Sequence, residues 1–131
     1  MKTIKVVAAI LHKDHQILIA KRNYGEFKGL FEFPGGKIEP GETGEEALKR
    51  EILEEMEVHI NVEGFFMNVH YEYPTFILDM DCYTCTLVDT HMTLNNHSEV
   101  KWIHKDDIET EWVPADILVI NEIRKRELDH G

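Results

Sequence analysis

The chain has 131 residues, of which 25 are acidic and 14 are basic, so its formal net charge is −11 at pH 7. This length suits one domain with enough chain to bury a core, and we expect a single domain over residues 1–131. The negative charge argues against a nucleic-acid polymer or an anionic membrane as partner, and no apolar run is long enough to span a membrane.

The N-terminal part of the chain predicts a β-hairpin and then a loop. Residues 4–11 and 16–21 are rich in aliphatic side chains, and the polar segment 12–15 between them predicts a turn. No small-residue cleavage site follows the first hydrophobic segment, which therefore predicts a strand and not a signal peptide. Residues 23–31 predict a loop that leads into Glu32 and Phe33.

A helix is predicted to begin at Gly44, after the Pro40-Gly41 turn. Thr43 and Glu46 have the spacing of a capping box, in which each side chain satisfies a backbone N–H group of the other residue. The apolar residues that follow, spaced at about 100° per residue, form a stripe that predicts a buried face: Leu48, Ile52, Leu53 and Met56.

Three glutamates, Glu51, Glu54 and Glu55, lie beside this stripe and can share one helical face, because residues three and four apart are neighbours on a helix. Their carboxylates would repel one another at short range, so we expect a cation between them. Hard oxygen ligands suit Mg²⁺ or Mn²⁺, whose other positions are typically taken by water and substrate phosphates. The alternative is a solvated acidic face, but these carboxylates adjoin the apolar stripe, and a glycine-rich turn at residues 33–36 precedes them.

The C-terminal half has the pattern of strands followed by a second helix. Pro74 marks a strand boundary, and Ile117, Ile120 and Ile123 have helical spacing after Pro114. The predicted elements are strands at residues 59–69, 76–88 and 101–104 and a helix over residues 115–127. Strands mixed with flanking helices predict an α/β fold, a sandwich built around a mixed β-sheet.

Cys82 and Cys85 lie in a predicted strand, residues 81–88, where odd and even positions face opposite sides, so the two thiols should diverge. Because there is no second ligand pair at zinc spacing and no disulfide framework, we expect reduced cysteines and a cytoplasmic protein. The eight histidines show no metal spacing and are interpreted as surface or packing residues.

The acidic helix belongs to a longer pattern that resembles the signature of the Nudix hydrolases. That signature is Gly, five residues, Glu, seven residues, and then Arg-Glu-aliphatic-x-Glu-Glu-x-Gly-aliphatic. The matching residues are Gly36, Glu42, Arg50, Glu51, Ile52, Glu54, Glu55 and Val58, while Glu57 replaces the second glycine. The similarity extends from the N-terminal strand to the C-terminal helix, and it looks like the MutT-like branch, with its 8-oxo-dGTP diphosphatases and CTP pyrophosphohydrolases.

The resemblance implies a Nudix-type α/β/α sandwich and an enzyme in which water attacks a phosphate of a nucleoside triphosphate, releasing nucleoside monophosphate and pyrophosphate. Arg50 would hold a glutamate through charge-assisted hydrogen bonds, and Glu42 would play a supporting acidic role. The ligands implied for Mg²⁺ or Mn²⁺ are Glu51, Glu54, Glu55 and the backbone carbonyl of Gly35.

Three residues outside the signature are implied as substrate contacts. Arg22 would face the phosphates, and Asp116 would hydrogen-bond the edge of the base. Phe33 would line the base pocket or pack in the core. The ordinary interpretations are a solvated arginine at the end of a strand and an aspartate that caps a helix, so these functional roles depend on the resemblance.

Two positions depart from the family pattern. Asn96 falls where many MutT-like members have a glutamate implicated in binding metal or water. Because an amide cannot act as a base, the proton-accepting role shifts toward Glu54 or else Glu99. Glu57 falls at a left-handed turn that suits glycine, where another residue costs roughly 1–2 kcal/mol, so we expect the helix to end differently here.

The departures leave a second class of function open, a nucleotide-binding sensor that has lost efficient hydrolysis. Asn96 supports the sensor, whereas the retained helix carboxylates favour an enzyme, because a binding module has little need of mutually repelling acids. The expected substrate is 8-oxo-dGTP, with CTP or 5-methyl-dCTP as the alternative. Nucleotide sugars and dinucleotides also fit a motif that specifies a diphosphate linkage. The protein would be a monomer or a homodimer.

Overall fold

The computed structural model describes residues 1–107 and 109–126, which form one mixed α/β domain. In chain order its elements are β1 (Thr3–Lys13), β2 (Gln16–Arg22), β3 (Phe31–Glu32), β4 (Gly35–Lys37), α1 (Gly44–Met56), β5 (Ile60–Glu72), β6 (Ile77–Leu87), β7 (His97–His104) and α2 (Pro114–Lys125). No helix within these described ranges is long and apolar enough to cross a membrane.

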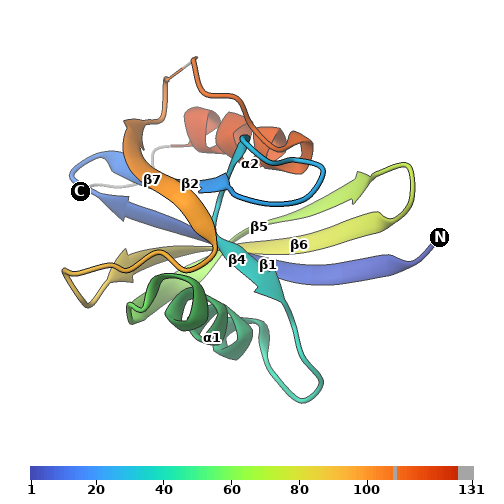
Figure 1. Ribbon diagram of the computed structural model, residues 1–131, viewed down its shortest axis with the longest axis horizontal. Coiled ribbons are helices and arrows are strands. Elements are labelled where there is room, and N and C mark those ends of the chain that lie inside the picture. Colours follow the sequence, from blue (N-terminus) through green and yellow to red (C-terminus); the bar gives the residue numbers. More distant parts are fainter. Residues whose placement is uncertain (108, 127–131) are drawn as a thin grey trace.

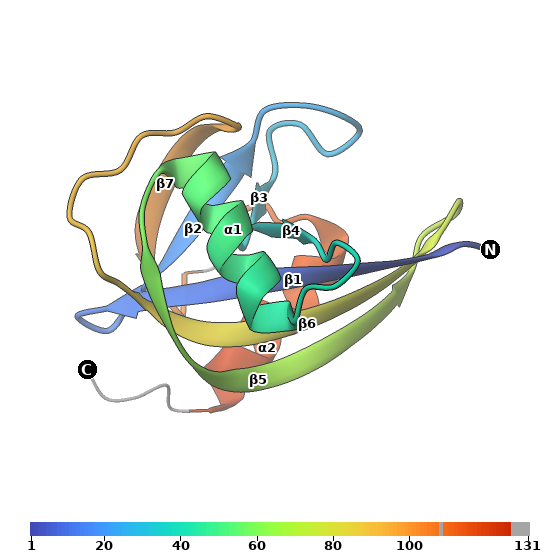
Figure 2. The same ribbon diagram turned by 90° about the horizontal axis from the view of Figure 1, so that it is seen from below.

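The strands lie between the two helices, which cover opposite sides of the sheet (Figure 1). The strand order is β3-β2-β1-β6-β5, with β4 paired to β1 and β7 paired to β2. β1 and β6 run parallel, and the other strand pairs are antiparallel. Viewed from below, α1 crosses in front of the strands (Figure 2). The predicted sandwich around a mixed sheet is therefore confirmed.

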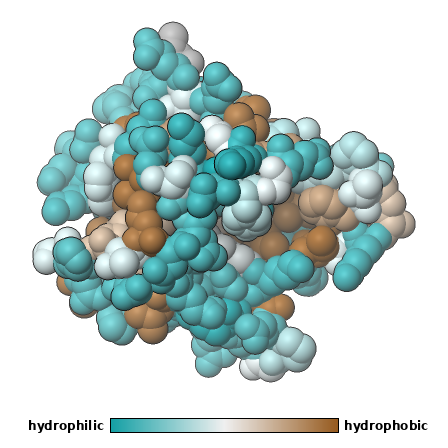
Figure 3. All heavy atoms as spheres, in the orientation of Figure 1, coloured by the Kyte–Doolittle hydropathy of each residue, from teal (hydrophilic) through white to brown (hydrophobic). Residues whose placement is uncertain are grey.

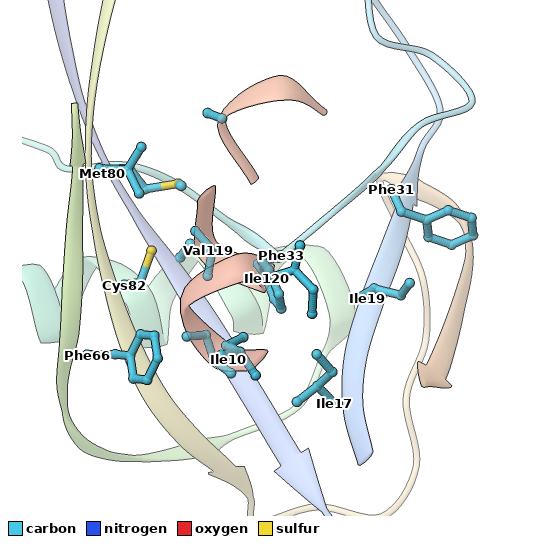
Figure 4. Close-up of a cluster of buried hydrophobic side chains, with 14 of the residues drawn as sticks. Ile10, Ile17, Ile19, Phe31, Phe33, Phe66, Met80, Cys82, Val119 and Ile120 are labelled. Carbon is cyan, nitrogen blue, oxygen red and sulfur yellow. The ribbon is translucent and has the colours of Figure 1, made fainter. Parts of the chain in front are cut away.

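β1 divides its side chains between two layers of core. Ala8 and Ile10 belong to the cluster that packs against α2, part of which is drawn in Figure 4. The neighbouring Val7, Ala9 and Leu11 belong to the cluster that packs against α1. Successive positions of a strand face opposite sides, so the uninterrupted apolar run of β1 is explained by burial on both faces.

The same alternation separates the two cysteines of β6. Cys82 lies in the cluster on the α2 side and Cys85 in the cluster on the α1 side, and both are free thiols. The prediction that the thiols diverge is confirmed. Burial raises the pKa of the Cys85 thiol to about 12, so this thiol stays protonated and unreactive at neutral pH.

α1 begins at Gly44 with the predicted capping box. The Thr43 hydroxyl accepts from the Glu46 backbone N–H at 3.1 Å, and the Glu46 carboxylate accepts from the Thr43 backbone N–H at 2.9 Å. The buried face is narrower than predicted, because Leu53 is 42% exposed. Ile52, the preceding residue, faces the core. Each step along a helix rotates the side-chain direction by about 100°, so Leu53 points away from the core. The buried residues of the predicted stripe are Leu48, Ile52 and Met56.

α1 ends in a left-handed residue, as a helix with a glycine at this position would. Glu57 has φ 53° and ψ 40°, and its backbone N–H donates to the Leu53 carbonyl. The expectation that the helix ends differently is therefore wrong. The Glu57 carboxylate accepts from the Asn95 side chain at 3.0 Å, a contact that glycine could not make and that helps hold this conformation.

A short segment before β7, residues 93–95, covers the C-terminal end of α1, and we call it the strap. The last carbonyl groups of a helix have no partner within the helix, and the strap supplies partners for three of them. Thr93 N–H donates to Met56 O at 3.0 Å, Asn95 N–H to Glu55 O at 2.8 Å, and the Asn95 side chain to Glu54 O at 2.8 Å.

Two strands depart furthest from the prediction. β4 (Gly35–Lys37) overlaps the region predicted as a turn, residues 33–36, and it pairs antiparallel with β1. Gly35 permits this close approach, because a Cβ atom there would collide with the backbone carbonyl of Val7. β7 begins at His97, well before its predicted start at Lys101, because its pairing with β2 continues through a bulge as far as Arg22.

The second helix, α2, occupies Pro114–Lys125. The predicted helix reaches Glu127, which lies outside the described residues. Of the three isoleucines at helical spacing, Ile120 and Ile123 are buried, but Ile117 is 42% exposed. Val119 and Ala115 complete the buried face, and Figure 4 shows Val119 and Ile120 among the core side chains.

Candidate active site

A pocket of about 560 Å³ lies between α1, the start of α2, and residues of β1, β3, β4 and β6. The face of the molecule in Figure 3 is mostly hydrophilic, with hydrophobic side chains in separate patches, whereas the pocket lining mixes acidic, aromatic and aliphatic side chains. The predicted site residues that line it are Arg22, Phe33, Gly35, Glu51, Glu55 and Asp116.

Arg50 gathers acidic side chains along α1 beside the pocket. Its Nε and Nη2 donate to the two oxygens of Glu42 at 2.6 and 2.9 Å, and its Nη1 donates to Glu51 at 2.9 Å and to Glu54 at 2.8 Å. Nη2 also donates to the Lys37 carbonyl at 3.0 Å, which ties α1 to β4. The hydrogen bonds from Arg50 lower the pKa of Glu42 to about 2. We call Arg50, Glu42, Glu51 and Glu54 the Arg50 cluster.

The predicted metal-binding glutamates are not equivalent in position. Glu54 is 57% exposed in its side chain, is turned toward Arg50 and is not among the pocket-lining residues. Glu51 extends from the Arg50 cluster into the pocket lining. It passes over Gly36, where a Cβ atom would collide with the Glu51 carboxylate. The structure thus places Glu51 and Glu55 in the pocket lining and leaves Glu54 outside it.

Glu55 is the buried acid of α1, with 6% of its surface exposed. Burial raises the pKa of its carboxyl group to about 9, with further contributions from a hydrogen bond with Glu51 and from nearby Glu32 and Glu54. A bound cation would relieve this repulsion and displace the proton. The pair Glu51 and Glu55 therefore fits a divalent ion. Within residues 1–107 and 109–126, no three acidic, histidine or cysteine side chains are already gathered as a metal cluster.

Asp116 does not cap its own helix. Its Oδ2 accepts from the backbone N–H of Phe33 at 2.8 Å, and α2 has no side-chain cap at Val113. Asp116 is 5% exposed. Burial raises the pKa of its carboxyl group to about 8, the nearby Glu32 adds to this, and Phe33 and Arg22 partly oppose it. A buried carboxyl group facing a pocket is a functional-site candidate.

Arg22 and Glu32 lie side by side in the pocket lining. Arg22 Nη1 lies 3.6 Å from Glu32 Oε1, and Arg22 Nη2 donates to the Tyr24 hydroxyl at 3.3 Å. The Arg22 side chain is 26% exposed, so it is not the freely solvated charge of the ordinary interpretation. Its Nε has no hydrogen-bond partner among the described residues. Glu32 was not selected from the sequence, although it opens the glycine-rich segment that carries Gly35.

Aromatic side chains form one wall of the pocket. Phe33 is 3% exposed and stacks on Trp112, with ring centroids 5.3 Å apart, so it both packs in the core (Figure 4) and lines the pocket. Tyr73, which was also not selected from the sequence, packs between Phe27 and Phe76. Its hydroxyl accepts from Ala115 N–H at 3.1 Å. The aromatic residues clustered around Pro74 were the available signal for this wall.

The residues at the start of β7 divide between the pocket and the surface. Asn96 lines the pocket, whereas Glu99, considered as an alternative proton acceptor, lies outside the lining and 3.6 Å from Lys21. His97 also lines the pocket, is 7% exposed, and has its Nε2 3.1 Å from Glu32 Oε2. The interpretation of all the histidines as surface or packing residues did not foresee this position.

Comparison with known proteins identifies relatives over most of the chain. The model of the NUDIX domain matches residues 6–120. The CTP pyrophosphohydrolase of Escherichia coli strain K12 is 35% identical over 121 residues, which cover 89% of this chain and 88% of that protein. The 8-oxo-dGTP diphosphatase of Haemophilus influenzae is 42% identical over 85 residues, covering 63% of this chain and 62% of that protein.

The fold agrees with these sequence matches. A crystal structure of a MutT Nudix hydrolase from Burkholderia pseudomallei aligns with a TM-score of 0.85 and 20% identity, covering 94% of this chain and 99% of that one. Nudix hydrolases generally use divalent metal ions. The matched residues include Arg22, the whole signature from Gly36 to Val58, and Asp116. The chain therefore belongs to the Nudix family, resembles its MutT-like members, and is a hydrolase that acts on phosphorus-containing anhydrides.

Proposed function

We propose that this protein hydrolyses a nucleoside triphosphate to nucleoside monophosphate and pyrophosphate, with Mg²⁺ or Mn²⁺ as cofactor. The observation that carries the proposal is a single pocket with two kinds of carboxyl group. Glu51 and Glu55 enter it from α1, and Asp116 enters it from α2 on the other side of the sheet. Such a pocket suits a ligand with phosphates at one part and a polar base at another.

The first part of the mechanism concerns the acids of α1. A divalent ion would neutralise charge on the phosphates and activate the attacking water. All three guanidinium nitrogens of Arg50 already contact carboxylates or a carbonyl, so Arg50 orients Glu51 and Glu54 and does not bind phosphate itself. Glu54 is our candidate for the proton acceptor, because it is the most exposed of the three acids. The residues that would hold the ion are Glu51, Glu54, Glu55 and the carbonyl of Gly35.

The second part concerns the nucleoside. Arg22 has a buried Nε without a protein partner among the described residues, and it supplies positive charge for a phosphate. The Phe33 N–H occupies Oδ2 of Asp116, which leaves Oδ1 for the base. Burial raises the pKa of Asp116 to about 8, which favours the protonated form at neutral pH, and that form can donate as well as accept a hydrogen bond.

For the base, we propose 8-oxo-dGTP as the first substrate to test. A second candidate is a cytosine nucleotide, CTP or 5-methyl-dCTP. The observation that favours cytosine is the similarity to the Escherichia coli CTP pyrophosphohydrolase, which extends over 88% of that protein. Asp116 suits both candidates, because a carboxylate accepts from the exocyclic amino group of cytosine and a protonated carboxyl group donates to a purine edge.

The test is a substrate panel at fixed Mg²⁺ concentration, containing 8-oxo-dGTP, dGTP, CTP, 5-methyl-dCTP, ATP and a nucleotide sugar, with pyrophosphate release as readout. EDTA replaces the metal in the control. Metal-dependent turnover at about 1–10³ s⁻¹, the usual range of enzymes, supports the proposal. Tight nucleotide binding without pyrophosphate release would instead support the sensor function, for which Asn96 remains the argument.

A further inference from the structure

Backbone hydrogen bonds between the strap and the end of α1 position His97 beside Glu55. The strap residue Asn95 donates its N–H to the Glu55 carbonyl at 2.8 Å, and β7 begins two positions later at His97. The same segment binds the Glu54 and Met56 carbonyls. The end of α1 and the start of β7 are therefore held as one unit.

The His97 ring lies between two acids of the pocket. Its side chain is 2% exposed, its Nε2 lies 3.1 Å from Glu32 Oε2, and its Nδ1 lies 4.0 Å from Glu55 Oε1. Nδ1 has no hydrogen-bond partner among the described residues. The distance to Glu55 is too long for a hydrogen bond.

A buried nitrogen without a partner is costly and needs an explanation. Glu55 is the acidic side chain that faces Nδ1, and it is also one of the acids that our proposed function assigns to the metal. Carboxylates that bind a metal are themselves held by hydrogen bonds from further residues, and loss of such a partner weakens metal affinity. A small movement of Glu55 as the ion binds would bring it within reach of Nδ1.

We propose that His97 is a positioning residue that fixes Glu32 through Nε2 and, in the metal-loaded protein, Glu55 through Nδ1. The inference rests on the proposed metal-dependent function. Because the bound ion displaces the proton of Glu55, the ring supplies the donor in both contacts, Nδ1–H to Glu55 and Nε2–H to Glu32, with a proton on each ring nitrogen. The ordinary alternative is a histidine that fills space in the core, for which the identity of the nitrogen atoms would not matter.

The two ring nitrogens can be tested separately with neutral amides. In His97→Asn the amide lies near the position of Nδ1, and in His97→Gln it lies near the position of Nε2. The measurement is a titration with Mn²⁺ alone, followed by the electron paramagnetic resonance signal of free Mn²⁺. We expect His97→Gln, which loses the contact with Glu55, to raise the Kd for Mn²⁺ by about 10- to 100-fold, and His97→Asn, which keeps that contact and loses the one with Glu32, to raise it less. His104→Asn, at the exposed end of the same strand, is the matched control.

Steady-state kinetics and melting temperatures complete the experiment. His97→Gln should lower kcat at fixed Mg²⁺, with little change in KM for the nucleotide, and His97→Asn should lower kcat less. Equal Mn²⁺ affinity in the wild type and both variants overturns the inference, and so does an equal loss in both variants that follows their melting temperatures. If the wild type itself neither binds Mn²⁺ nor hydrolyses any nucleotide, the proposed function fails as well, and the two failures are thereby distinguished.

Discussion

Glu42, which Arg50 holds, and the buried acids of the pocket, Glu55 and Asp116, have opposite properties although all three are carboxyl groups. In the Arg50 cluster, Glu42 receives two hydrogen bonds from one guanidinium group, and its pKa falls to about 2. Inside the pocket, burial raises the pKa of Glu55 to about 9 and that of Asp116 to about 8. Neither buried acid has an ion pair with a lysine or arginine among the described residues.

The difference teaches which acids are satisfied by the protein and which need a ligand. Glu42 is satisfied by Arg50 without any bound molecule, and Arg50 in turn ties α1 to β4 and orients Glu51 and Glu54. Burial disfavours the ionised forms of Glu55 and Asp116, and a cation or a base edge would provide the missing interaction. Substitutions at Glu55 or Asp116 change the buried acids, and a substitution at Arg50 changes the contact with Glu42.

The largest effect is expected for Glu55→Gln. Loss of a metal-binding carboxylate removes several kcal/mol of transition-state stabilisation, or more than about 100-fold in kcat. Because glutamine is close in shape to the protonated glutamate, the melting temperature should hold or rise. Rates at saturating Mg²⁺ and thermal melts would be compared with Glu45→Gln, a change at an exposed position of the same helix. An active Glu55→Gln variant would show that Glu55 does not bind the metal.

The next effect concerns the base. Asp116→Asn keeps an oxygen for the Phe33 N–H, and Asp116→Ala does not. Loss of one base-edge hydrogen bond typically costs about 1–3 kcal/mol, so both variants should reduce discrimination between bases while hydrolysis continues. The measurement is kcat/KM for 8-oxo-dGTP, dGTP, CTP and ATP, with melting curves for each variant. An unchanged order of substrates with a lower melting temperature would limit Asp116 to a structural role.

A further effect is expected in the pH dependence of stability. The pKa of Asp116 is raised from 3.8 to about 8 in the folded protein, so between these values the folded state binds its proton more tightly than the unfolded chain does. This contribution to the free energy of unfolding is complete below pH 3.8 and is lost as the pH rises toward 8. Relative to Asp116→Asn, the wild type should therefore lose stability across this range in urea unfolding. If the free energy of unfolding changed with pH in the same way in the wild type and in Asp116→Asn, Asp116 would be ionised in the folded protein over this pH range.

The smallest effect is expected for Arg50→Lys, read from acid unfolding. The pKa of Glu42 is lowered from 4.5 to about 2, so its contribution to stability is present above pH 4.5 and is lost as the pH falls toward 2. Lysine lacks the planar fork through which Arg50 donates to both oxygens of Glu42, so the variant should unfold at a higher pH than the wild type. Circular dichroism across this acid range, with the exposed Lys49→Arg as control, would measure it. Superimposable acid transitions would show that the forked contact with Glu42 is not formed in solution.

Elements with local signals could be predicted from the sequence. The capping box of Thr43 and Glu46, the hairpin of β1 and β2, and the buried face of α1 depend on residues close together in the chain. β4 could not be predicted, because three residues with two glycines show no periodicity. Its existence depends on pairing with β1, far away in sequence.

The same reasoning applies to the candidate site. The signature placed Glu51 and Glu55 on one helix, and the structure places both in the pocket lining. The pattern gave no sign that Arg50 turns Glu54 outward, because that geometry depends on rotamers and on Glu42 across a turn. No motif or spacing in the sequence distinguishes His97 from the other histidines. Its burial results from the strap and from the extension of β7 along β2, which are tertiary features.

The hydrogen bond between Phe33 and Asp116 joins residues 83 positions apart in the chain. Contacts that close long loops are entropically expensive until the intervening structure has formed. The part of the pocket that would recognise the base is therefore completed only when α2 docks, after all the strands have been synthesised. The Arg50 cluster closes much earlier, within a short stretch of chain. A nascent chain can thus assemble its acidic helix well before it gains any means of selecting among nucleotides.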